Sequence, residues 1–343
     1  MRLTVRLCAT LWAVLFVGGC GSSDGTGTDA PPQPQASAKA QDFPKAAGRT
    51  LAQLRADLPE GPVFTPSVSL LRPGTNRVGF ALFDVARKQL TGASVALYVA
   101  RPDGSGLRGP FLARSESLAV KPQFRSQTST QDPDATKSVY VADVPFARRG
   151  KVILVAVARI DGRLLSTGGH SMEVGADGGS PPDVGDAAPR IHTPTIASVG
   201  GDAEKISTRV PPADDLLRTD LADVLGKKPI VLVFATPKLC VSRVCGPVVD
   251  VAAQVKARVG DRAAFVHQEI YNDNDVAKGF RPQVRAYRLP TEPWFFVIDR
   301  SGRVAARFEG AVSVGELQRA VAKVIGTGRP AAGGSAAASG QRE

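Results

Sequence analysis

The sequence predicts two folded domains, an all-β sandwich followed by an α/β domain. Between residues 55 and 176, short stretches rich in β-branched residues alternate with turn signals, and no helical period stands out. From residue 184 to 327, apolar strand patterns alternate with helical patterns, which is typical of a parallel or mixed sheet with crossover helices. A length of 343 residues suits two domains, and 43% hydrophobic with 22% charged residues is ordinary for a folded protein.

Residues 1–20 have the pattern of an export signal. Arg2 and Arg6 precede an apolar run over 7–17, which is shorter than the roughly 20 residues of a typical membrane span. The run ends in Val17-Gly-Gly-Cys20, which resembles the lipobox of bacterial lipoprotein signals. This resemblance implies cleavage before Cys20, lipidation of Cys20, and an extracytoplasmic protein anchored to the cell membrane by that lipid. An ordinary secretory signal is the alternative.

The four cysteines leave one pair in the mature chain. The same resemblance implies that Cys8 is removed with the signal and that lipidation converts Cys20 into a thioether. Cys240 and Cys245 therefore remain as two thiols in an oxidising compartment, where disulfides form and persist.

Three further segments are too poor in apolar residues to fold by themselves. They are a flexible linker over 21–50, a short linker over 176–182 and a disordered tail over 328–343, all rich in Gly, Ser, Pro or Ala. The net charge is +11, but the Lys and Arg residues are scattered and form no basic run. Nucleic acid is therefore not an expected partner.

The first domain, over 55–176, is predicted to be a sandwich of short strands. Turn signals at 72–74, 102–104 and 161–162 separate them. The stretch over 140–150 resembles immunoglobulin-like domains of bacterial envelope proteins. The domain has no cysteine and one histidine, His170, so we expect a spacer or binding module. The predicted strands are Ser67–Leu71, Arg77–Phe83, Ser94–Ala100, Ser138–Val144, Lys151–Arg159 and Leu164–Val174.

The second domain begins with an apolar run that is typical of a buried strand. The following helix is predicted from its apolar spacing and from Pro247 at its first turn. A hairpin around 300–302 and an amphipathic helix close the domain. The predicted elements are strand Ile230–Phe234, helix Pro247–Val259, strand Ala263–Ile270, strands Trp294–Asp299 and Arg303–Phe308, and helix Ser313–Ile325.

Four motifs in this domain resemble the thioredoxin-like family, in particular its membrane-anchored thiol–disulfide oxidoreductases and peroxiredoxins. They are Val184-Gly-Asp-Ala-Ala-Pro189, Pro229-Ile-Val-Leu-Val-Phe-Ala-Thr-Pro237, Cys245-Gly-Pro247 and Pro293-Trp-Phe-Phe-Val-Ile-Asp-Arg-Ser-Gly302. The resemblance implies a thioredoxin-like fold over 184–327 and a cis-proline at Pro293. The sequence departs from the family at Val248, which occupies the position of the second cysteine of the CGPC motif. The second thiol, Cys240, lies upstream of Cys245 instead.

The resemblance places Cys245 at a helix N-terminus, where unpaired amides and the helix dipole stabilise a thiolate. We therefore expect a pKa lowered toward about 3.5–7.5, assisted by the charge of Arg243, with Cys245 as the more activated thiol and Cys240 as its partner. The expected activity is thiol–disulfide exchange with thiols or disulfides of envelope proteins, without a cofactor or a metal. A structural disulfide that closes the loop and a metal-binding pair remain the alternatives.

In the family, the residue before the cis-proline lies beside the disulfide, and here it is Glu292. Its carboxylate would raise the pKa of Cys245, or it would accept the proton that Val233, at the place of the family's buried acid, cannot accept. A solvated loop residue is the alternative for Glu292, and an ordinary trans proline is the alternative for Pro293.

His267 and Trp294 are predicted to be structural, His267 in a strand and Trp294 in the core. Copper-delivery proteins of the same fold use two cysteines and a distant histidine. Their cysteine spacing differs from that of Cys240 and Cys245, and His267 does not match their histidine. The alternative functions are therefore a thiol-based copper-binding chaperone and a redox-silent envelope binding protein.

Overall fold

The computed structural model describes residues 38–175, 180–240 and 243–326. The expected signal peptide over 1–20 with Cys20, the start of the 21–50 linker, most of the 176–182 linker and the 328–343 tail lie outside the described residues. Within the described part of the chain, no helix is both long enough and apolar enough to cross a membrane.

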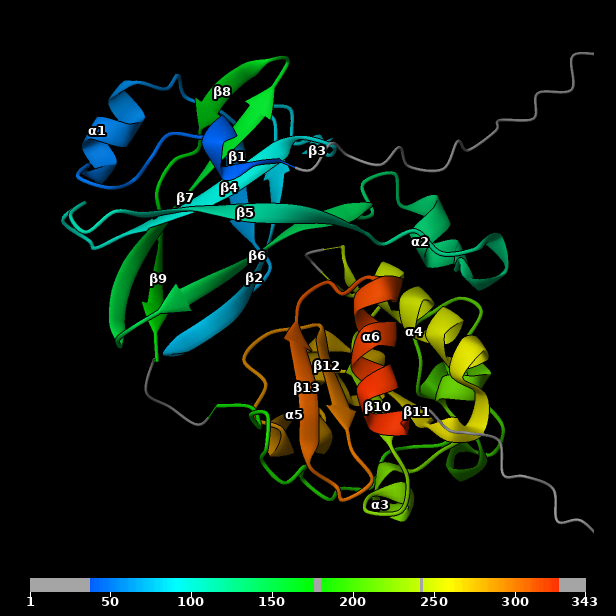
Figure 1. Ribbon diagram of the computed structural model, residues 1–343. Coiled ribbons are helices and arrows are strands. Elements are labelled where there is room, and N and C mark those ends of the chain that lie inside the picture. The colour runs from blue at the N-terminus through cyan, green and yellow to red at the C-terminus, as the bar shows by residue number, and fades with distance from the viewer. Residues whose placement is uncertain (1–37, 176–179, 241–242, 327–343) are drawn as a thin grey trace, which may run out of the picture. The chain divides into compact units, whose positions relative to one another are not determined.

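The described residues up to 175 contain one antiparallel sheet of nine strands (Figure 1). Its order is β1-β2-β6-β5-β4-β7-β8, with β3 paired to β2 and β9 paired to β7. The strands are β1 (Val63–Pro66), β2 (Gly74–Phe83), β3 (Gln89–Leu90), β4 (Ser94–Ala100), β5 (Arg108–Ser117), β6 (Ser138–Phe146), β7 (Gly150–Ile160), β8 (Arg163–Ser166) and β9 (His170–Val174), and the helices are α1 (Leu51–Ala56) and α2 (Gln127–Gln131).

This sheet curls because its inward-facing residues share one core. Alternate residues of β2, β4, β6 and β7, such as Phe80, Leu97 and Leu154, pack in a single cluster. The opposite face of β4 and β7 is buried as well, under α1 and Phe43. Phe43 is 4% exposed. The expectation that the whole of 21–50 is a flexible linker is therefore wrong for residues 38–50, since their apolar side chains cover this second face.

The predicted strands agree with the structure where burial gives a clear pattern. β4 has the predicted bounds, and β6 and β7 extend the prediction by one or two residues. The strand expected at Ser67–Leu71 is wrong: β1 ends at Pro66, and the Ser69 N–H and hydroxyl instead donate to Glu309. β5 was missed because Arg and Ser occupy many of its positions, and Leu164–Val174 divides into β8 and β9.

The expected α/β domain is confirmed by a four-stranded mixed sheet in the order β11-β10-β12-β13. β10 and β11 are parallel, and β12 is antiparallel to both β10 and β13. Helices α4 and α6 cover one face, and α3 and α5 cover the other (Figure 1). The bounds are α3 (Leu221–Val224), β10 (Ile230–Phe234), α4 (Cys245–Val259), β11 (Ala264–Gln268), α5 (Pro282–Ala286), β12 (Trp294–Ile298), β13 (Val304–Glu309) and α6 (Val314–Ile325).

Local chemistry explains why these elements form where they do. Every residue of β10 is buried because helices cover both faces of the sheet, which gives a continuous apolar run rather than an alternating one. Helix α6 starts after Ser313, whose hydroxyl accepts from the Glu316 N–H while the Glu316 carboxylate accepts from the Ser313 N–H. Helix α4 begins at Cys245, two residues earlier than predicted.

A buried ion pair fixes α4, the helix that carries Cys245. The Arg209 Nε donates to the Asp250 carboxylate at 2.9 Å, and the two side chains are 6% and 2% exposed. The second carboxylate oxygen accepts from the N–H and the hydroxyl of Ser126, both at 3.1 Å, and Arg209 also donates to the Phe124 carbonyl. Asp250 is thus fully hydrogen-bonded, which offsets the cost of burying its charge.

Replacing Asp250 with Asn leaves the Arg209 charge buried without its counter-ion. We expect the D250N variant to lose about 3–5 kcal/mol of unfolding free energy, measured by urea denaturation. The matched control is D214N, since Asp214 pairs with Arg218 at the surface and is 54% exposed. D214N should change stability by less than about 1 kcal/mol. Equal losses in the two variants would show that the Arg209–Asp250 pair has no special weight.

Candidate functional site

The register of the α/β sheet brings distant parts of the chain together at one end. β10 and β12 are antiparallel neighbours, with Phe234 opposite Trp294. The loop after Phe234 holds Cys240 and runs to Cys245, and the two residues before Trp294 are Glu292 and Pro293. The peptide bond between Glu292 and Pro293 is cis, as expected. Because β10 ends where β12 begins, the cysteine loop meets the cis-proline loop.

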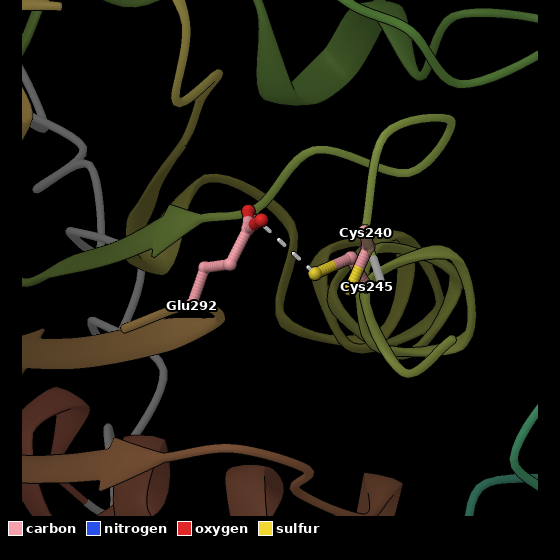
Figure 2. Close-up of side chains that lie close together, drawn as sticks. All are labelled: Cys240, Cys245 and Glu292. Carbon is pink, nitrogen blue, oxygen red and sulfur yellow. Dashed lines mark hydrogen bonds between the residues drawn. The ribbon is translucent and has the colours of Figure 1, made fainter. Parts of the chain in front are cut away.

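Two thiols and a carboxylate converge at this point (Figure 2). The sulfurs of Cys240 and Cys245 and a carboxylate oxygen of Glu292 all lie within 4.8 Å of one another. The Cys245 Sγ donates to Glu292 Oε2 at 3.9 Å. Both cysteines are present as thiols. The structure therefore brings together the four residues expected to form the thiol–disulfide exchange site: Cys240, Cys245, Glu292 and Pro293.

Cys245 is fully buried, and this changes its expected chemistry. Its side chain is 0% exposed and packs in the core beneath α4 with Val233, Val248 and Val249. Burial raises the pKa of Cys245 well above its usual value, and the neighbouring Cys240 and Glu292 raise the pKa further. The expected lowering of this pKa is wrong, because desolvation and two acidic neighbours outweigh the favourable helix terminus.

Cys240, in contrast, is partly exposed and opens onto a pocket of ≈ 290 Å³. The expectation that Cys245 is the more activated thiol therefore does not fit the accessibility of the two sulfurs. Walls of the pocket come from the cysteine loop, from the first turn of α4 and from the segment that holds α2. The other lining residues are Thr128, Ser129, Asp132, Ala135, Pro237, Lys238, Arg243, Gly246 and Pro247.

Arg243 does not direct its charge at the thiols. Its guanidinium pairs with Asp132 at 3.2 Å and with Asp134. Its carbonyl accepts from the Thr136 N–H at 3.3 Å. The expected assistance to a Cys245 thiolate is therefore wrong, because two carboxylates already neutralise this cation. Its structural effect is to fix the end of the cysteine loop just before α4.

Glu292 is partly buried rather than solvated. Burial raises its pKa to about 8, and the nearby Cys240 and Glu269 act in the same direction, whereas the hydrogen bond from Cys245 lowers it. The carboxyl group can therefore hold or release a proton near neutral pH. This supports one of the two roles expected for Glu292 from the sequence, namely that its carboxylate accepts a proton.

A buried polar group beside the site was not predicted from the sequence. Glu269 is 1% exposed, and one carboxylate oxygen accepts from the N–H and hydroxyl of Thr208 at 2.6 and 2.8 Å. His267 lies two residues earlier, in β11, and its Nε2 is 3.0 Å from the Ala235 carbonyl. Among the described residues, the second Glu269 oxygen and His267 Nδ1 have no hydrogen-bond partner. The signal in the sequence was the polar run His267-Gln268-Glu269 at the end of an apolar strand.

His267 is not a member of the cysteine cluster, and Trp294 belongs to the core as expected. The expectation of a structural strand histidine therefore agrees with its position in β11. Burial lowers the pKa of His267, an effect that Arg209 and Arg281 strengthen and Glu269 opposes.

Comparison with known proteins yields similarity to solved structures alone. No family model matches the chain, and no curated protein matches it. A putative thiol:disulfide interchange protein DsbE from Chlorobium tepidum is 21% identical, over 42% of this chain and 99% of its own, with a TM-score of 0.31. A thioredoxin family thiol:disulfide interchange protein from Chlorobium tepidum TLS is 21% identical, over 44% and 100%, with a TM-score of 0.28. Likeness at this level transfers no activity, so the site's own geometry carries the interpretation.

Acid should destabilise the protein through His267. Because folding lowers its pKa, the unfolded state binds the proton more tightly, and stability is lost as pH falls below about 6.5. The slope from this residue is at most about 1.4 kcal/mol per pH unit. We expect H267Q to show a shallower fall in urea-unfolding free energy between pH 7 and pH 5 than the wild type. Parallel pH profiles for the two proteins would contradict a buried neutral imidazole.

The two thiols should differ in reactivity. Cys240 should react with iodoacetamide at least about tenfold faster than Cys245, because burial and the raised pKa both suppress the Cys245 thiolate. Peptide mass spectrometry of the reduced, folded protein gives the two rates. A denatured sample serves as the control, in which the rates should become similar. Faster labelling of Cys245 in the folded protein would refute the proposed order.

Proposed function

We propose that this chain carries out thiol–disulfide exchange through Cys240 and Cys245. The observation that supports it is the convergence of two thiols and a carboxylate beside the cis Glu292–Pro293 bond, with one sulfur open to a pocket and the other buried. A partly exposed thiol and a buried thiol divide the reaction into an attacking group and a resolving group.

In the proposed reaction, the Cys240 thiolate attacks one sulfur of a substrate disulfide. A bond forms between Cys240 and that sulfur, the substrate S–S bond breaks, and the other substrate sulfur leaves as a thiolate. Cys245 then loses its proton and attacks the Cys240 sulfur, which forms the Cys240–Cys245 disulfide and releases the second substrate thiolate. Two electrons pass from the pair to the substrate, and a dithiol protein restores the reduced pair by the reverse steps.

Glu292 has a defined part in the second step. Its carboxylate oxygen is 3.9 Å from the Cys245 sulfur, and within the described chain Glu292 forms no ion pair with a basic residue. In its ionised form it is positioned to accept the Cys245 proton as the buried sulfur attacks. Val233, at the position expected for a buried acid, is apolar and fully buried, so it cannot take this role.

The proposal also includes the setting of the reaction. The lipobox-like motif ending at Cys20 supports a lipid anchor on the extracytoplasmic side of the cell membrane, with envelope proteins as substrates. The antiparallel sheet domain would act there as an immunoglobulin-like spacer or binding module.

Trapping a mixed disulfide tests the order of attack. With a disulfide-bonded substrate peptide, C245S should accumulate a covalent adduct on Cys240, because the resolving thiol is missing. C240S should accumulate little or none, and non-reducing mass spectrometry measures both. A trapped adduct on Cys245 alone would reverse the assignment of the two roles.

The competing interpretation is that Cys240 and Cys245 form a structural disulfide. The reduction potential of the pair distinguishes a structural disulfide from a redox-active one. A redox-active pair should equilibrate with glutathione buffers at a reduction potential above about −300 mV, whereas a structural disulfide lies below that value.

The E292Q variant tests the proton-acceptor role of Glu292. It should slow resolution of the mixed disulfide on Cys240 and leave formation of that mixed disulfide nearly unchanged. Circular dichroism of each variant checks that it is folded.

A further inference from the structure

The cluster at the end of β10 also has the composition of a metal site. Cys240 comes from the loop, Cys245 from the first turn of α4, and Glu292 from the residue before Pro293 (Figure 2). Cys245 is held by α4, and Glu292 lies two residues before the start of β12. Thiolate sulfur and carboxylate oxygen are both donors that Zn²⁺ accepts. We propose that the reduced Cys240 and Cys245, together with Glu292, bind one Zn²⁺ ion.

The spacing of the donors is close to that of a bound ion. With Zn–S near 2.3 Å and Zn–O near 2.0–2.2 Å, neighbouring donors of a tetrahedral site lie about 3.5–3.8 Å apart. The Cys245 sulfur and the Glu292 oxygen are 3.9 Å apart, and no pair in the cluster exceeds 4.8 Å. Side-chain rotations that move the donor atoms by about 1 Å would therefore bring all three donors into contact with one ion without movement of the strands.

The local charge also favours a cation. Among the described residues, no Lys, Arg or His forms an ion pair with Glu292, and Arg243, one of the two cations that line the pocket with Lys238, is already paired with Asp132 and Asp134. A partly buried carboxylate beside two thiols is an anionic site when all three are ionised. A divalent ion bound to all three groups would offset most of that charge.

The fourth position of the site would remain open. His267 is not part of the donor cluster, and its Nε2 lies 3.0 Å from the Ala235 carbonyl. Cys240 lines the ≈ 290 Å³ pocket, so water or an external ligand can complete the coordination from that side. Three protein donors and one open position are typical of an accessible Zn²⁺ site, in contrast to the closed four-ligand structural sites.

Zn²⁺ fits this set better than Cu(I) because of Glu292. Cu(I) selects soft sulfur donors, whereas a carboxylate oxygen is an ordinary Zn²⁺ ligand. The inference rests on the proposed function only in that both require reduced thiols. Formation of the Cys240–Cys245 disulfide uses the sulfur electrons that would bind the ion, so oxidation should release it.

The test is metal binding by the reduced full-length chain. Zn²⁺ is titrated against a chromophoric chelator, and Co²⁺ replaces it to report thiolate coordination by its charge-transfer and visible absorption. We expect one ion per chain, at least about a hundredfold weaker binding in C240S and C245S, and about tenfold weaker binding in E292Q. E292Q should also change the visible Co²⁺ spectrum.

A second group of potential ligands provides the matched control. His192, Asp220 and Asp223 also lie within 4.8 Å of one another, with His192 exposed and bonded to Asp220. H192A should leave one tightly bound ion per chain. Loss of the ion in H192A would overturn the proposal, and so would an ion that stays bound in both cysteine variants. The proposal would also fail if the chain bound no Zn²⁺ but bound Cu(I) tightly, with the same affinity in E292Q.

The outcome can be separated from that of the exchange reaction. Exchange is measured in the presence of a chelator, and Zn²⁺ binding is measured without a disulfide substrate. Zn²⁺ binding without exchange would refute the proposed function and retain the metal site. Exchange without Zn²⁺ binding would refute the metal site alone.

Discussion

Burial of the Cys245 sulfur at the first turn of α4 is the constraint on which the site depends. The sulfur lies in the same core cluster as Val233 of β10 and Val248 of α4, so moving it outward would require α4 to separate from the sheet. Burial keeps the proton on the sulfur and leaves Cys240 as the thiol that solvent reaches. The Arg209–Asp250 pair holds the same helix at Asp250, five residues after Cys245, and therefore contributes to the geometry of the site without touching it.

Exchange and metal binding begin with the same event, the loss of a proton from a sulfur in a poorly solvated place. In one case the electron pair goes to a disulfide sulfur, and in the other it goes to a cation. Glu292 has a role in both proposals, since its carboxylate, 3.9 Å from the Cys245 sulfur, would accept the proton in one and bind the ion in the other. The oxidation state of the pair would therefore decide which partner the protein engages.

The elements of the α/β domain could be predicted well because its strands are continuous apolar runs and its helices have clear starts, as Ser313 with Glu316 shows. The cis bond before Pro293 followed from resemblance to a family. The reactivity of the thiols could not be predicted, because burial and pairing depend on the fold. The sequence placed Arg243 near the thiols, but its partners Asp132 and Asp134 lie more than a hundred residues away. β5 was missed for a similar reason, since its polar residues become a strand only between β4 and β6.

In the proposed reaction, the pocket beside Cys240 limits which disulfides can reach its sulfur. A volume of ≈ 290 Å³ is at the lower end of the range for small-molecule sites, so it holds side chains next to a cysteine rather than the edge of a folded domain. Thr128, Ser129 and Asp132 form part of its wall. A disulfide inside a compact protein would therefore have to be presented by local unfolding. Selection among substrates would then depend more on how easily each substrate protein unfolds locally around its disulfide than on its amino-acid sequence.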